Sequence, residues 1–225
     1  MLRPREVLIE TRPVDERLRL GSIENPVRAL LHGTGAIASI VGSALLLTQQ
    51  FHPALVVYAL TLVGMYSAST LYHGVPWSTA WKARMQKLDH AFIYLLVAGT
   101  FTALFVGETQ GYWRPLLAVW SLTALGIGRE FLPILRNRWI LVGQLGLGAL
   151  ALIAVGHFLG ESGSSVRWLT VGGGVIYLGG LAMFVRSWPR LFPRVFGFHE
   201  TFHVLVIAAS VAHFLAVWQT WVSAN

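Results

Sequence analysis

The 225-residue chain contains no cysteine. Disulfides, thiolate metal sites and cysteine nucleophiles are therefore excluded. Charged residues are also scarce, at 12% of the chain, against roughly 25% in an average soluble domain. Because 55% of the residues are hydrophobic, this scarcity excludes a disordered chain and argues against a water-soluble globule.

Long uncharged intervals are the main feature of the sequence. No Asp, Glu, Lys or Arg occurs between Arg28 and Lys82, and a membrane-spanning helix needs roughly 20 apolar residues. Two such helices fit in this interval, and five more apolar runs follow. The sequence thus predicts an all-α integral membrane protein, a bundle of seven transmembrane helices at about 29–49, 54–74, 88–107, 114–132, 139–159, 168–187 and 199–222. We expect residues 1–26 to form a polar tail and 27–225 a single transmembrane domain.

Glycine is abundant inside these predicted helices, for example at Gly126, Gly128, 143–148 and 172–174. Small residues let membrane helices approach one another closely. No phosphate-binding loop pattern surrounds these glycines, so a packing role is expected.

Lysine and arginine are distributed unevenly between the two ends of the predicted helices. Fifteen of the 17 lie in the N-terminal tail and in the loops on the same side, while the other side has only Arg114 and Arg167. Cytoplasmic loops retain the positive excess, which predicts a cytoplasmic N-terminus and an outside C-terminus. The basic residues form no clustered stripe, so the net charge of +7 indicates membrane topology and not a nucleic-acid partner.

Several histidines fall near the predicted cytoplasmic side. His199 and His203 are four residues apart on one helix, which lets both imidazoles reach a single ion. His73 has the same depth on another helix, and three neutral imidazoles plus one water form the usual open site of a catalytic zinc. The sequence therefore indicates a Zn²⁺ site, although a polar cluster that only caps the helix start would give the same pattern. His32 lies near this side without an assigned role.

Asp89 opens an otherwise apolar predicted helix. Such an acid is costly in a membrane unless it is paired, interfacial or functional. It is either a carboxylate that favours the helix dipole or a base for a metal-bound water. Ser69 lies four residues before His73, on the same helix face, and is either a packing residue or part of the site. His90 is rotated by about 100° from Asp89, and His213 lies about 15 Å beyond His203 along the helix, so neither is expected to share the ion.

The string from His199 to His203 also matches H-E-x-x-H, the zinc-protease signature in which the glutamate is the general base. No Asp or Glu follows Glu200, and no histidine stands at the metzincin spacing, so the usual third ligand is missing. An intramembrane protease would need an acid from another helix, for which Asp89 is the candidate.

Three blocks resemble the bacterial hemolysin III proteins, which are related to the progestin and adipoQ receptors and, more distantly, to alkaline ceramidases. The resemblance extends from about Glu24 to Phe214. The blocks are Ser69-x-x-Tyr72-His73, then Leu88-Asp89-His90-x-x-Ile93-Tyr94 leading to Ala98-Gly99-Thr100, and His199-Glu200-x-Phe202-His203-Val204 with a later His213-Phe214.

This resemblance implies a seven-helix protein of the bacterial inner membrane with zinc near the cytoplasmic face. Its ligands would be His73, His199 and His203, with Asp89 and Ser69 beside the water. The implied function is hydrolysis of lipid amides or esters in membrane lipid homeostasis, with a membrane lipid as substrate or ligand. A receptor-like or pore-forming protein with structural zinc is the alternative, followed by an intramembrane protease based on Glu200 and a transporter.

Overall fold

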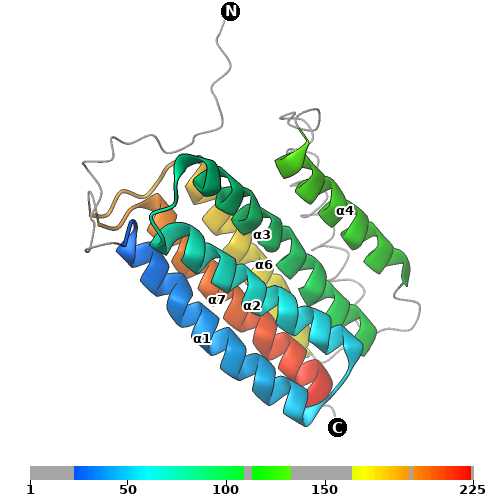
Figure 1. Cartoon of the computed structure of the whole chain (residues 1–225). Helices are drawn as coiled ribbons and strands as arrows, with labels where there is room; N and C mark the ends of the chain where they lie inside the picture. The colour runs from blue at the N-terminus through cyan, green and yellow to red at the C-terminus, as the bar shows by residue number, and fades with distance from the viewer. Residues whose placement is uncertain (1–22, 109–112, 133–163, 193–194, 224–225) are drawn as a thin grey trace, which may run out of the picture.

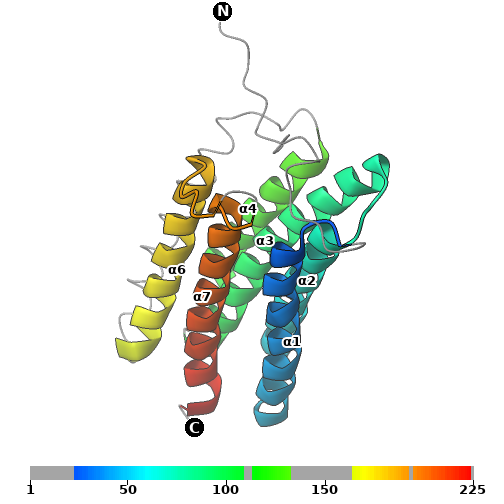
Figure 2. The same cartoon turned by 90° about the vertical axis from the view of Figure 1, so that its left-hand side faces the viewer.

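The computed structural model describes residues 23–108, 113–132, 164–192 and 195–223. In this part of the chain the regular elements are helices, and the loop before Phe198 contains an isolated bridge between Phe192 and Phe196. The helices are α1 (Pro26–Gln49), α2 (Pro53–Gly74), α3 (Thr79–Glu108), α4 (Trp113–Phe131), α6 (Ser164–Val185) and α7 (Phe198–Trp218), which the π-helix η4 (Gln219–Ser223) continues. They lie side by side along one bundle axis (Figure 1), with α7 between α6 and α1 (Figure 2).

Five of the described helices are long and apolar enough to cross a membrane. They are α1, α2, α3, α6 and the continuous helix formed by α7 and η4. The fourth predicted span corresponds to α4, which is not among the five and carries Arg114, Arg129 and Glu130. The span predicted at 139–159 and most of the predicted N-terminal tail lie outside the described residues. The all-helical membrane architecture is thus confirmed, while the number seven and the orientation stay predictions.

The start of α3 differs from the sequence prediction. The apolar run begins at residue 88, but the helix begins at Thr79. Its first turns carry Lys82, Arg84 and Lys87. Apolar composition marks only the part of a helix that lies in lipid, and a polar extension of the same helix can continue into water. The length of the apolar run therefore underestimated the length of α3.

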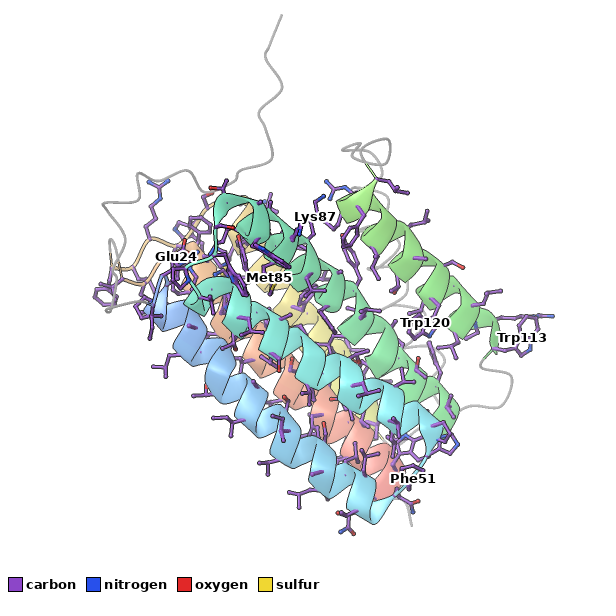
Figure 3. The ribbon with its side chains drawn as sticks, in the orientation of Figure 1. Glu24, Phe51, Met85, Lys87, Trp113 and Trp120 are labelled. Atoms are coloured by element: carbon purple, nitrogen blue, oxygen red, sulfur yellow. The ribbon has the colours of Figure 1, made fainter. Side chains whose placement is uncertain are left out.

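Basic side chains gather at the end of the bundle where α1 begins, which we call the basic end. In Figure 3 Glu24 and Lys87 lie at this end, and Phe51 and Trp113 lie at the opposite one. The described basic residues of this end are Arg28, Lys82, Arg84, Lys87, Arg129, Arg186 and Arg190. The described part of the chain has only Arg114 and Arg167 near the starts of α4 and α6, so the charge asymmetry expected from the sequence corresponds to two physical ends.

The buried side of α1 is polar. Its buried residues recur every three or four positions, as one helix face requires, and are Arg28, His32, Gly35, Ser39, Ser43 and Leu46. Large apolar side chains instead lie exposed on α1, namely Leu30, Ile37, Ile40, Val41 and Leu45. This inversion of the soluble-protein pattern fits a helix with its outer face in lipid, and it turns a file of polar groups toward the bundle interior.

Two of the glycines that the sequence analysis named, Gly126 and Gly173, allow close contacts between helices as predicted. A methyl group at Gly126 would lie 2.6 Å from the Tyr94 ring of α3, and one at Gly173 would lie 2.6 Å from the His213 ring of α7. Gly172 has open space around it, and 143–148 lies outside the described residues. The absence of a side chain at Gly173 leaves room for the His213 ring beside α6. There His213 Nε2 lies 3.1 Å from the Thr170 carbonyl oxygen.

Candidate metal centre

His73 lies at the end of α2 and is held there by the chain that enters α1. Its side chain is buried, and its carbonyl accepts a hydrogen bond of 3.0 Å from the Asn25 backbone N–H. The Gly74 carbonyl accepts a similar bond from the Glu24 N–H, 3.2 Å. The Glu24 carboxylate in turn pairs with Lys82 of α3, with 2.8 Å between Oε2 and Nζ. The backbone of His73 is therefore fixed between the starts of α1 and α3.

His199 and His203 lie in the first turns of α7, which Glu200 caps. The Gly197 N–H donates to Glu200 Oε2 at 2.7 Å, so the glutamate satisfies one of the free N–H groups at the helix start. Phe184 of α6 contacts the His199 ring with centroids 5.1 Å apart. Capping and this ring contact fix the start of α7, and with it both imidazoles.

The structure brings His73, His199 and His203 together. Their ring centroids lie 5.1 Å apart for His73 and His199, and 4.9 Å apart for both other pairs. One ring nitrogen of each lies within 4.8 Å of those of the other two. These three residues, which the sequence analysis grouped as candidate ligands, form a group that can hold a metal ion.

The donor set fits zinc. Ligand nitrogens 2.0–2.1 Å from a tetrahedral zinc are about 3.3 Å from one another, so small side-chain rotations would close the observed group around an ion. Within the described residues, His73 Nε2 and His203 Nδ1 are buried without a hydrogen-bond partner. Buried ring nitrogens are normally partnered, and a metal would satisfy both. Histidine suits zinc among several transition metals, so the donors alone do not specify the ion.

Asp89 and Ser69 form a second pair. Both are buried, at 8% and 2% exposure, and Ser69 of α2 is a near neighbour of the Asp89 carboxylate of α3. Ser69 lies one turn before His73 on α2. Asp89 is not in the group of converging metal ligands found among the described residues, so its role beside the ion stays a prediction.

Two other histidines that the sequence set aside are occupied elsewhere. His90 Nδ1 lies 3.2 Å from Glu130 Oε2 of α4, and His213 contacts α6 through the Thr170 carbonyl. The side chains of His90 and His213 thus contact other helices, in agreement with the expectation from helical geometry that neither shares the ion.

His32 is a neighbour of the metal group to which the sequence gave no role. Its ring lies against that of His203, with centroids 3.8 Å apart, and edge-on to Tyr66 at 5.1 Å. His32 lies on the polar face of α1, and this position could have indicated that it borders the metal group. That inference requires knowing which face of α1 points into the bundle.

Glu200, the glutamate of the H-E-x-x-H string, has both oxygens engaged. Oε2 accepts the capping bond from Gly197, and Oε1 lies 2.6 Å from Arg28 Nε of α1. A general base must reach the attacking water, whereas this carboxylate caps its helix and joins α7 to α1.

Long apolar helices and a buried histidine group near one end of the bundle define the class, a multi-pass membrane protein with a histidine group able to bind metal. The family model of haemolysin-III related proteins matches residues 21–214. The chain therefore belongs to the haemolysin-III related family, as its three sequence blocks indicated.

Two relatives cover most of the chain. The Hemolysin-3 homolog of Bacillus subtilis (strain 168) is 29% identical over 206 residues, which cover 86% of this chain and 92% of the relative. Hemolysin-3 of Bacillus cereus is 30% identical over 206 residues, which cover 86% of this chain and 90% of the relative. The similarity thus extends over nearly the whole of both relatives.

Proposed function

We propose that this protein is a zinc-dependent hydrolase of lipid amide or ester bonds that acts in membrane lipid homeostasis. The observation that carries the proposal is the convergence of His73, His199 and His203 from two helices. Among the described residues, His73 Nε2 and His203 Nδ1 are buried and have no hydrogen-bond partner. Three histidines are the ligand set of catalytic zinc sites that keep one position open. The substrate would be a membrane lipid, because the site lies within helices apolar enough to cross a membrane.

The residues around the group would divide the chemistry between them. A zinc ion held by the three imidazoles would supply Lewis-acid polarisation of an acyl oxygen and activation of water. Asp89 is the candidate to accept the proton of the attacking water. Ser69 is a near neighbour of Asp89 and would hold its carboxylate in place by donating a hydrogen bond. We place the protein in the bacterial inner membrane with its N-terminus in the cytoplasm, which would set the metal group near the cytoplasmic face.

The test is turnover of long-chain N-acyl amides and phospholipid esters by detergent-purified, zinc-loaded protein. Asp89→Asn keeps the size of the side chain and the zinc ligands, so we expect it to retain zinc and to lose about 10²–10⁴-fold in rate, the usual contribution of a general base. Undiminished turnover by Asp89→Asn would contradict the assigned role, and zinc loss in that variant would indicate that Asp89 supports the metal instead.

A receptor-like or pore-forming protein with structural zinc is the second candidate, favoured by the name of the Bacillus cereus relative, Hemolysin-3. In that case zinc would only tie α7 to α2. His73→Ala and His203→Ala would then lower the thermal stability, and wild type would hydrolyse none of the lipids while releasing a dye trapped in vesicles.

An intramembrane protease is less well supported, because Glu200 has both oxygens engaged. Glu200→Gln separates it from the hydrolase. Gln keeps an oxygen that accepts from the Gly197 N–H, so folded, zinc-loaded Glu200→Gln should hydrolyse lipid far better than Asp89→Asn. A protease would lose peptide cleavage with Glu200→Gln.

A further inference from the structure

His32 is buried beside the metal group with neither ring nitrogen satisfied. Its side chain belongs to the interior face of α1 and the residue is 4% exposed. Within the described chain, neither Nδ1 nor Nε2 has a hydrogen-bond partner. The backbone of His203 is close to the ring, but it makes no hydrogen bond of ordinary distance and angle with it.

The elements that pack on α1 do not supply the missing partner. Within the described part of the chain, the elements that pack most closely on α1 are α2 and α7. From α2, Tyr66 presents its ring edge-on to His32, and its side chain lies near Ser210 of α7. From α7, His203 presents the face of its ring at a centroid distance of 3.8 Å. Among the described residues, both neighbours therefore meet the imidazole through their rings, and neither makes a hydrogen bond with it.

An imidazole carries at least one N–H donor in every protonation state. Buried donors without a partner are rare in folded proteins, and each needs a specific explanation, such as a catalytic role or a bound molecule or ion. His32 also lies outside the converging metal ligands of the described residues, which are three other histidines. Its free donor is therefore available to a molecule that enters the site, and that molecule must present an acceptor.

We propose that His32 is a substrate-binding residue that donates a hydrogen bond to the acyl oxygen of the lipid at the metal site. This inference rests on the proposed function and deepens it. A carbonyl or carboxylate oxygen has only acceptor capacity, which matches the unsatisfied N–H. Contact between the rings of His32 and His203 places this donor beside the metal group, and the apolar helices around it suit an acyl chain.

The experiment measures binding of oleate, the carboxylate that hydrolysis of an oleoyl lipid would release, to zinc-loaded protein in detergent. His32→Phe keeps a ring against His203 and removes both nitrogens. We expect zinc per chain to be unchanged and the Kd for oleate to rise about tenfold or more, as loss of a hydrogen bond to a charged group implies. His32→Gln restores an N–H donor and should bind oleate within about threefold of wild type.

Two further variants keep the test decisive. His52→Asn removes a histidine at the opposite end of the bundle, where its ring accepts from the Ala54 N–H, and Asn is an equally good helix cap, so it should bind oleate as wild type does. His32→Leu replaces His32→Phe if the larger ring prevents folding. Equal oleate affinity in wild type and the apolar variants, or no oleate binding by wild type, would overturn the inference, as would zinc loss on replacing His32.

The inference and the proposed function fail in different ways. If wild type hydrolyses lipids while oleate affinity is unaffected by the apolar variants, the hydrolase stands and the role of His32 is wrong. If oleate binding depends on the donor at position 32 but wild type hydrolyses nothing, His32 binds an acyl group in a protein that is not a hydrolase.

Discussion

Arg28 and Glu200 form a buried ion pair between residues 172 positions apart in the sequence, with 2.6 Å between Nε and Oε1. Only 9% and 10% of their side chains are exposed. The pair joins the first turn of α1 to the first turn of α7, directly beside His199. It connects the helix that carries His32 to the helix that supplies two of the three candidate zinc ligands.

Removing one partner of this pair should destabilise the protein strongly. Arg28→Ala leaves the Glu200 carboxylate buried without its guanidinium, and breaking a buried pair in this way costs about 3–5 kcal/mol. Arg84→Ala is the matched control, because Arg84 is exposed. Thermal denaturation in detergent should show a much lower midpoint for Arg28→Ala than for Arg84→Ala; equal midpoints would show that the pair adds nothing measurable.

Zinc content should depend on His73, His199 and His203 and not on the histidines outside this group. Wild type is expected to hold about one zinc per chain by elemental analysis, because three imidazoles and an open position make a complete site. The double variant His199→Ala, His203→Ala removes two of the three ligands and should hold none. His90→Gln should keep its zinc, because His90 faces Glu130. A folded, chelator-free wild type without zinc would contradict the site.

The sequence predicted those parts of the site that depend on one helix or on depth in the membrane. Spacing on α7 paired His199 with His203, and the ends of the apolar runs put His73 at the same level. The pairing of Arg28 with Glu200 could not be predicted this way, because it requires knowing that α1 packs on α7.

The place of His32 was missed for a related reason. In a soluble protein a helix buries its apolar side, so the hydrophobic pattern shows which face points inward. The helix α1 does the opposite. It exposes Ile37 and Leu45 and buries a polar face with His32, Gly35 and Ser39. In lipid the apolar face points outward, and only the packed structure shows that the polar face meets His203. The start of α3 was misjudged because charged turns beyond the membrane leave no apolar signal.

Packing of Tyr66 against α1 should make Gly35 intolerant of any side chain. A Cβ at Gly35 would lie 2.5 Å from Tyr66 Cδ1, and Tyr66 is buried and contacts His32. Gly35→Ala should therefore cost about 1–3 kcal/mol through overpacking. Gly33→Ala is the control on the same helix, since its Cβ would lie 3.7 Å from Thr70 Cγ2, an ordinary contact. Denaturation midpoints of the two variants should differ clearly, and similar midpoints would show that Tyr66 moves aside freely.

The absence of native cysteine allows a direct test of the predicted orientation. Phe51 is 80% exposed in the turn between α1 and α2, and Ser78 is exposed between α2 and α3 at the basic end. The positive excess at that end predicts that it faces the cytoplasm. The reagent is a maleimide that passes the outer barrier of the cells but cannot cross the inner membrane. Phe51→Cys should therefore be labelled in intact cells. Ser78→Cys should be labelled only after the membrane is opened, and the cysteine-free wild type gives the background. The reverse pattern would put the N-terminus and the metal group on the outside, and a hydrolase there would draw its substrate from the outer leaflet.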